Sequence, residues 1–244
     1  MNMKAVILAG GKGTRLRPYT TVIPKPLMPI GDLPILEILL RQLVNHGVND
    51  VVLAVGYMSH LFRAMFQNGE RYDLKISYSF EDQPLGTAGP LANIIHDLSD
   101  DFFVLNGDLL TTLNFRNMMN FHINHEASAT IGLYERNVKI DFGVVETDDK
   151  NRLNNYTEKP TFNFKVSMGI NIFNREKVMP YLIPGKYLDI PDLMMQMQQD
   201  GLPVLCFHEN CYWLDIGRVD DYQVANDIFE SRRSEFLPQV QANK

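Results

Sequence analysis

Residues 4–16 read Lys4-Ala5-Val6-Ile7-Leu8-Ala9-Gly10-Gly11-Lys12-Gly13-Thr14-Arg15-Leu16, and Pro24-Lys25-Pro26 follows after a short loop. The apolar run 5–8 predicts a strand that is buried on both faces, as in a parallel sheet. The turn after it is rich in glycine, which leaves backbone N–H groups free to face an anion. A strand that enters such a turn predicts an anion site at one edge of an α/β sheet.

Positive charge gathers at the front of the chain. Five Lys and Arg residues precede the first acidic residue, Asp32, whereas the whole chain of 244 residues has a formal net charge of -6. A basic island in an acidic chain indicates one local site for a polyanion. We therefore expect neither nucleic acid nor a membrane surface as a partner.

The composition excludes several other classes of protein. No apolar run approaches the roughly 20 residues that span a bilayer, and the first residues show no signal-peptide pattern. Cys206 and Cys211 are too few for a disulfide framework, and their spacing matches no common zinc pair. These features predict a cytoplasmic protein.

Strand and helix patterns alternate along the first half of the chain. We expect strands at 5–8, 51–55, 75–80 and 102–105, and helices at 36–44, 61–66 and 87–95. This order predicts a Rossmann-like, doubly wound α/β sheet, in which ligands bind beyond the carboxyl ends of the strands. The glycine-rich turn and Asp108 both follow strands, so both should lie at that edge.

The second half is richer in strands. We expect strands at 129–134, 143–146, 166–173 and 204–207, and helices at 115–125, 189–199 and 220–230. No repeat and no Pro/Ser-rich linker interrupts the chain. We therefore expect one domain over residues 1–244 with two functional halves, and frayed residues after about Phe236.

Two common phosphate motifs fail at the glycine-rich turn. A P-loop needs Gly-Lys followed directly by Ser or Thr, but Gly13 separates Lys12 from Thr14. A dinucleotide fingerprint needs a small residue where Leu16 stands and an acidic residue at the end of the next strand, whereas Asp32 opens a helix.

The string Leu-Ala-Gly-Gly-x-Gly-Thr-Arg-Leu at 8–16 resembles the signature of the nucleotidyltransferases that make nucleotide sugars (the NDP-sugar pyrophosphorylases). Further motifs similar to that family follow in family order, at 24–30, 84–89, 105–108, 142–146, 158–160 and 213–217. The resemblance covers nearly the whole chain. It implies a mixed, GT-A-like sheet flanked by helices, with a nucleotide-binding half at 1–112 and a sugar-binding half at 113–235.

The resemblance also implies a reaction, in which a nucleoside triphosphate (NTP) and a sugar 1-phosphate give a nucleotide sugar and pyrophosphate. Catalysis of such a displacement is mostly positioning and neutralisation of charge. Arg15 is the candidate to stabilise the leaving pyrophosphate, and Lys25 to contact the α-phosphate or the incoming phosphate. Asp108 and Asp215 are the candidate ligands of Mg²⁺, which one or two carboxylates plus substrate phosphates usually hold.

The remaining candidate site residues divide between the two substrates. Those predicted to bind the nucleotide are Leu8, Ala9, Gly10, Gly11, Gly13, Thr14, Glu81, Gln83, Gly86 and Thr87. Those predicted to bind the sugar phosphate are Gly143, Glu158, Lys159 and Gly169. Lys159 should hold the phosphate, and the Glu158 carboxylate can accept hydrogen bonds from sugar hydroxyls.

Glu81 bears on the identity of the base. It stands five residues before Gly86, where uridylyl and thymidylyl relatives commonly carry a Gln. An ionised Glu only accepts hydrogen bonds, which matches the N1–H and N2–H donors of guanine, so we expect GTP. Gln83 would read a pyrimidine if the loop shifts register, which leaves UTP or dTTP open.

The sequence says less about which sugar 1-phosphate is the substrate. Ser167-Met168-Gly169 stands where family members often carry Asn-Ala-Gly, and it resembles the heptose guanylyltransferases more. Mannose 1-phosphate and a heptose 1-phosphate are both expected candidates.

Two other function classes compete with this interpretation. A non-catalytic relative that binds nucleotide sugars would tend to lose the charged residues, but Arg15, Lys25, Asp108, Lys159 and Asp215 are all present. The Lys25 loop and Glu158-Lys159-Pro160 argue against a cytidylyltransferase that acts on an alcohol phosphate. The chain ends too early for the second domain of many relatives, so we expect one function. Relatives often form dimers or tetramers, so the resemblance also implies a possible homo-oligomer.

Overall fold

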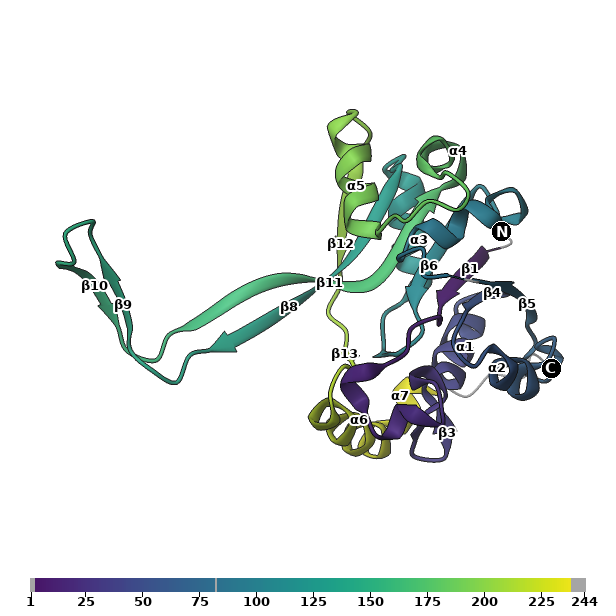
Figure 1. Ribbon diagram of the computed structural model, residues 1–244, viewed down its shortest axis with the longest axis horizontal. Coiled ribbons are helices and arrows are strands. Elements are labelled where there is room, and N and C mark those ends of the chain that lie inside the picture. Colours follow the sequence, from purple (N-terminus) through teal and green to yellow (C-terminus); the bar gives the residue numbers. More distant parts are fainter. Residues whose placement is uncertain (1–2, 82, 238–244) are drawn as a thin grey trace.

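The computed structural model describes residues 3–81 and 83–237 (Figure 1). A sheet of seven strands runs through it in the order β12-β8-β11-β6-β1-β4-β5. The strands are β1 (Met3–Leu8), β4 (Val48–Val55), β5 (Lys75–Phe80), β6 (Asp101–Asn106), β8 (Ala129–Lys139), β11 (Thr161–Asn174) and β12 (Val204–His208). β11 is antiparallel to both of its neighbours, and the other pairs are parallel. The predicted mixed α/β sheet is confirmed.

The strand order reverses beside β1. β4 and β5 continue the sheet on one side of β1, and β6 lies against its other side. In doubly wound sheets the crevice at such a switch point, beyond the carboxyl ends of the strands, is where ligands bind. The glycine-rich turn follows β1 and Asp108 follows β6, so the turn and Asp108 both border this crevice.

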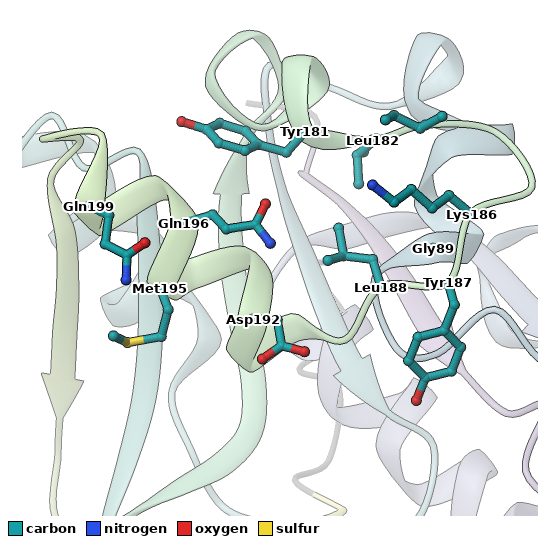
Figure 2. Close-up of a pocket in the computed structure, with 11 residues that line it drawn as sticks. Gly89, Tyr181, Leu182, Lys186, Tyr187, Leu188, Asp192, Met195, Gln196 and Gln199 are labelled. Atoms are coloured by element: carbon teal, nitrogen blue, oxygen red, sulfur yellow. The ribbon is translucent and has the colours of Figure 1, made fainter.

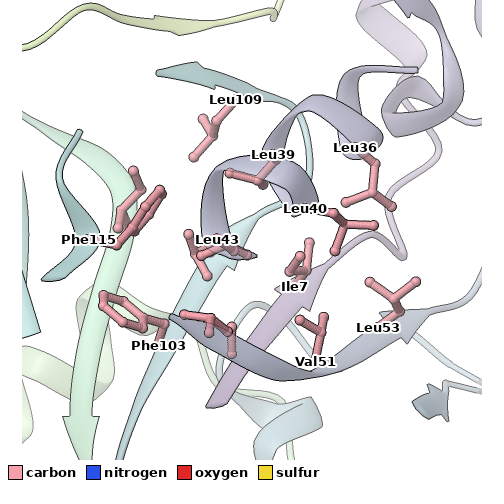
Figure 3. Packing of buried hydrophobic residues seen from close by; sticks show 14 of the residues in the cluster. Ile7, Leu36, Leu39, Leu40, Leu43, Val51, Leu53, Phe103, Leu109 and Phe115 are labelled. Carbon is pink, nitrogen blue, oxygen red and sulfur yellow. The ribbon is translucent and has the colours of Figure 1, made fainter. Parts of the chain in front are cut away.

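Helices cover both faces of the sheet. On one face, α1 (Ile35–Asn45), α2 (Ser59–Phe66) and α3 (Phe115–Asn124) pack in a single apolar cluster (Figure 3). Leu36, Leu39, Leu40 and Leu43 of α1 point into it at helical spacing, as predicted. The other face carries a second cluster that includes Val6 and the buried residues of α4 (Arg175–Val178) and α5 (Ile190–Gln199). β1 is therefore buried on both faces, as its sequence predicts.

A third apolar cluster joins the last helices, α6 (Val219–Ser231) and α7 (Arg233–Phe236), to segments from the first half of the chain. It gathers α6 and α7 against the other side of α1 and the short strands β2 (Pro29–Ile30), β3 (Leu33–Pro34) and β7 (Leu109–Thr111). The predicted fraying concerns residues 238–244, which lie outside the described residues. Among the helices of 3–81 and 83–237, none combines the length and the apolar character that crossing a bilayer would need.

The sequence predicts an α-helix at 87–95, and this prediction is wrong. That segment forms two 3₁₀ turns, η5 (Gly89–Asn93) and η6 (Ile95–Asp97). The Thr87 backbone N–H donates to the Asp189 carboxylate, and Pro90 removes a backbone donor in the first turn. Tertiary contacts to the 187–190 segment therefore shape this stretch more strongly than helix propensity does.

Strands β8 and β11 are longer than predicted and leave the sheet together. β8 pairs with β12 only as far as Leu133, and β11 pairs with β6 only from Ile170 onward. Beyond these points the two strands pair only with each other, and β9 (Val144–Thr147) and β10 (Leu153–Thr157) form a second hairpin at the tip. We call residues 134–167 the arm, which points away from the rest of the molecule (Figure 1).

The core makes a direct prediction about stability. Phe103 of β6 is fully buried, and its ring meets Phe115 edge to face at 5.7 Å between centroids (Figure 3). Phe103→Ala should lower the free energy of unfolding by about 3–5 kcal/mol, because it removes buried apolar area and leaves a cavity. Denaturant titration measures the change. Phe142→Ala is the control, since Phe142 on the arm is 78% exposed; equal effects from the two variants would contradict this packing.

Candidate active site

A cavity of about 960 Å³ opens at the predicted edge of the sheet. Its wall includes the turn after β1, Glu81, residues 83–87, Asn106 at the end of β6, and Gly217. Twelve of the residues predicted to act in catalysis or nucleotide binding line it: Leu8, Ala9, Gly10, Gly11, Gly13, Arg15, Lys25, Glu81, Gln83, Gly86, Thr87 and Asp108. These twelve predicted residues therefore lie around a single cavity, and Asp215 is not among its lining residues.

Lys25 joins the two predicted metal ligands. Its ammonium, buried in the structure, forms an ion pair with Asp108 Oδ2 and lies 3.4 Å from Asp215 Oδ1. The two aspartates are 107 residues apart in the sequence, yet both contact one Lys Nζ. The structure thus brings together the carboxylate pair and the cation on which the prediction depends.

A small two-stranded sheet produces this meeting. β7 pairs antiparallel with β13 (Trp213–Asp215) in a register that sets Asp215 opposite Leu109, the residue after Asp108. The Ile216 backbone N–H also donates to the Asp108 carbonyl at 3.3 Å. A side chain at Gly107 would lie 3.1 Å from the Leu8 carbonyl oxygen, so glycine lets the chain turn close to β1 here.

Electrostatics at Asp108 fit a cation ligand. Burial raises the pKa of the Asp108 carboxyl and the Asp215 charge raises it further, while Lys25 acts in the opposite direction. Asp108 Oδ1 is buried and has no hydrogen-bond partner among the described residues. A buried carboxylate oxygen without a donor is a free acceptor for a hard cation.

The carboxylates form a pair and not a larger cluster. Within 3–81 and 83–237, no group of three or more His, Cys, Asp or Glu side chains is placed to hold a metal. Mg²⁺ needs no such cage, because it keeps waters and takes substrate phosphates as ligands alongside one or two carboxylates. The residues present therefore fit Mg²⁺ better than a structural zinc.

The glycine-rich turn presents cations to the cavity. Gly13 has a φ of 58°, in the left-handed region that favours glycine, and it leads into the 3₁₀ turn η1 (Thr14–Leu16). Arg15 and Lys12 both line the cavity, and in the described part of the chain neither side chain has a hydrogen bond or ion pair. Lys12 belongs to the quoted motif but is absent from the predicted site residues, and Thr14 is exposed and does not line the cavity.

Glu81 borders both the glycine-rich turn and residues 84–89, which we call the base loop. Its Oε2 accepts a hydrogen bond from the Leu85 backbone N–H at 3.4 Å, and its Oε1 lies 3.2 Å from where a Cβ on Gly10 would stand. Burial raises the pKa of the Glu81 carboxyl, and the Leu85 bond opposes the rise. Gly10 therefore makes room for this carboxylate in the cavity.

The base loop is tied to a segment that sequence analysis assigns to structure alone. Asp189 Oδ1 accepts from the backbone N–H and the hydroxyl of Thr87, at 2.9 and 3.1 Å, and its Oδ2 accepts from the Tyr187 hydroxyl at 2.6 Å. Both Tyr187 and Asp189 line the cavity. The hydrogen bond from Tyr187 lowers the pKa of the Asp189 carboxyl. In the sequence, Asp189 before Pro191 signals only a helix start, so no local pattern could reveal these contacts.

The predicted sugar-phosphate residues separate into two places. Gly169 stays with the site: its φ is 69°, and a Cβ there would lie 2.5 Å from Asn106 Nδ2. Gly143, Glu158 and Lys159 lie on the arm instead (Figure 1). The Tyr156 hydroxyl donates to Glu158 at 3.2 Å, and Lys159 is exposed with a φ of 46°.

A second hollow lies beside α5 (Figure 2). It measures about 420 Å³ and shares Tyr187 with the larger cavity. Lys186 and Asp192 are the charged side chains that line it, and none of the predicted site residues does. It lacks the cationic cluster that two phosphorylated reactants require.

Comparison with known proteins agrees with this geometry. Residues 4–232 match the protein family described as Nucleotidyl transferase. A UTP–glucose-1-phosphate uridylyltransferase from Synechocystis is 36% identical over 239 residues, which cover 90% of this chain and 61% of that protein. A mannose-1-phosphate guanylyltransferase catalytic subunit beta from Danio rerio is 37% identical over 227 residues, covering 90% and 62%. The chain thus spans about three-fifths of the length of these relatives.

Solved structures share the fold. HddC from Yersinia pseudotuberculosis superposes with a TM-score of 0.71 at 24% identity, covering 93% of this chain and 99% of that one. A Bacillus anthracis structure assigned as a glucose-1-phosphate thymidylyltransferase gives a TM-score of 0.75 at 24% identity, covering 99% and 98%. Since the family match takes in nearly the whole sequence, this chain belongs to the nucleotidyl transferase family.

Proposed function

We propose that the protein transfers a nucleotidyl group from an NTP to a sugar 1-phosphate and releases pyrophosphate. The observation that carries this proposal is the contact of Lys25 with both Asp108 and Asp215 beside the glycine-rich turn. Two anionic reactants repel each other unless cations lie between them. Lys25, Lys12 and Arg15 line one cavity and supply this positive charge. Asp108 lines it too, and Asp215 does not line it but contacts Lys25.

The reaction assigns a task to each group. The sugar phosphate oxygen attacks the α-phosphorus in line, and negative charge builds up on the leaving pyrophosphate. Arg15, at the cavity wall, stabilises that charge, and the backbone of the glycine-rich turn faces the triphosphate. Lys25 contacts the α-phosphate or the incoming phosphate as a point charge, next to the two carboxylates that would hold the metal ion.

Enzymes of this family generally use a divalent metal ion. We propose Mg²⁺ at Asp108 and Asp215, where the unpartnered Asp108 Oδ1 is a free acceptor. When bound, the ion neutralises phosphate charge.

The proposed identities of the base and of the sugar rest on fewer residues than the reaction does. Glu81 at the cavity wall accepts hydrogen bonds, which favours guanine and hence GTP. The Danio rerio relative is a mannose-1-phosphate guanylyltransferase, and the Synechocystis relative uses UTP and glucose 1-phosphate. We propose GTP with mannose 1-phosphate or a heptose 1-phosphate.

Turnover tests the proposal directly. Release of pyrophosphate from GTP, UTP, dTTP, CTP and ATP is measured against a panel of sugar 1-phosphates with Mg²⁺, and with EDTA as the blank. Arg15→Ala should lower turnover at least about 100-fold, because a charge-stabilising donor is lost. Arg17→Ala is the matched control, since Arg17 is exposed and does not line the cavity. Absence of turnover with every pair would instead favour a binding or regulatory role.

Base preference depends on Glu81. Glu81→Gln should lower kcat/KM for GTP at least about tenfold, because an amide places a donor where guanine presents donors. The ratio of dTTP or UTP to GTP use should rise in the same variant. Glu176→Gln, on the exposed surface of α4, serves as the control. A wild-type preference for UTP or dTTP would refute the assignment of guanine.

Guanine binding should depend on pH. Burial raises the pKa of Glu81. The ionised carboxylate accepts from both guanine donors, whereas the protonated carboxyl carries a donor on one oxygen. Binding of GDP should therefore be full above that raised pKa and weaken as the pH falls through it. Calorimetric titration of GDP in the acid range measures the effect, which Glu81→Gln should abolish. An equal pH dependence in both proteins would place the titrating group elsewhere.

A further inference from the structure

At its base the arm touches the body, where the Tyr134 ring lies 5.3 Å from that of Trp213. Farther out, the arm is a regular ribbon with exposed side chains. From Thr161 to Ser167, every residue of β11 is paired with one of β8, from Lys139 to Leu133. The pairing then shifts between Ser167 and Asn171, where β11 enters the sheet. The arm therefore leaves the body at this irregularity and continues as an isolated two-stranded ladder (Figure 1).

The two faces of this ladder differ in chemistry. Residues that are directly paired in an antiparallel ladder share a face, and alternate residues share it too. One face therefore carries Tyr134, Arg136, Val138, Phe162, Phe164 and Val166. The opposite face carries Glu135, Asn137, Lys139, Thr161, Asn163 and Lys165.

The apolar face is exposed. Phe164 is 51% exposed, and Phe162 and Val138 are each 41% exposed. A two-stranded ribbon is marginally stable in water unless it packs on something. An amphipathic ribbon with aromatic residues on one face is therefore built to lie on an apolar surface.

The arm also places the predicted site residues Glu158 and Lys159 far from the cavity of their own chain. Gly169 lies against Asn106 at the cavity, and Lys159 is ten residues earlier in the sequence. An extended strand rises about 3.3 Å per residue, so Thr161 at the far end of β11 lies roughly 26 Å along the strand from Gly169, and Lys159 stands at that far end. A lysine side chain does not bridge such a gap, and the cavity of the same chain lacks this cation.

We propose that the arm of one copy lies across the cavity of a second copy and supplies Lys159 and Glu158 to it. The proposal rests on the proposed function for the role of these two residues. A symmetric exchange covers both apolar ribbon faces and completes both cavities, because a two-fold interface uses the same surfaces on each copy. Each active site is then made of the body of one chain and the arm of the other.

An apolar surface lies where the partner's arm would pack. Tyr19, Val22 and Ile23 are exposed on the loop after the glycine-rich turn, and Val219 is exposed two residues after Gly217. The Tyr57 hydroxyl, from a residue of the cavity wall, donates to the Thr21 carbonyl at 3.3 Å and holds this loop at the rim. The rim and the ribbon thus offer complementary apolar surfaces next to the cationic cavity.

Complementation between two inactive variants tests the exchange. Lys159→Ala damages the arm, and Asp108→Asn damages the body, so each purified alone should lose turnover. Co-expression with two different tags and tandem purification gives the mixed dimer. One of its two cavities combines an intact body with an intact arm, so it should regain about half of the wild-type turnover. Lys165→Ala, on the polar face of the ribbon, is the control that keeps activity.

The possible outcomes separate the two proposals. An inactive mixed dimer, a monomeric wild-type protein or full activity in Lys159→Ala would overturn the exchange. Absence of wild-type turnover with every substrate pair would count against the proposed function alone. In that case the exchange is decided by sedimentation velocity: Phe162→Asp with Phe164→Asp should turn a dimer into monomers, and Asn163→Asp on the polar face should not. An unchanged dimer in the double variant would refute it.

Discussion

The contact of one buried lysine with two carboxylates is the constraint that organises this molecule. Lys25 comes from a loop near the start of the chain, Asp108 from the end of β6, and Asp215 from the end of β13. A buried ammonium without an anionic partner is costly, and so is a buried carboxylate without a cation. The pairing of β7 with β13 keeps the two aspartates together, so the last third of the chain must fold back onto the first.

This arrangement divides the site into a fixed part and an extended part. The glycine-rich turn, Lys25 and the carboxylates are held by the central sheet and three apolar clusters. Glu158 and Lys159 lie on the arm, far from those clusters. Rigid elements position charged groups more precisely than an isolated ribbon does. In the exchange we propose, the surface of the partner copy fixes the arm and so positions the charges of Glu158 and Lys159.

Sequence patterns predict the parts that local physics determines. The buried strand β1, the helix α1 and the turn at 9–13 each carry their own signal, and the motif positions predict the meeting of Asp108 with Asp215. The 3₁₀ turns at 89–97 were expected as a helix, because the hydrogen bonds from Thr87 to Asp189 span 102 residues. The length of the arm escaped prediction, although Phe162, Phe164 and Val166 alternate as a strand should. Alternation marks a face, but it does not say whether that face packs within the same chain.

The base loop and the catalytic cation are held by separate networks. Thr87 and Asp189 fix the loop after Glu81, and within residues 3–81 and 83–237 no hydrogen bond links them to Lys25 or its aspartates. A substitution at the base contact can therefore change which donors and acceptors the loop presents without moving the charges that act on the phosphates. A guanylyltransferase and a uridylyltransferase both match this chain at nearly equal identity, 37% and 36%. Such a separation is compatible with relatives of both base types, and it is why we assign the proposed choice of nucleotide to Glu81 and not to the Lys25 cluster.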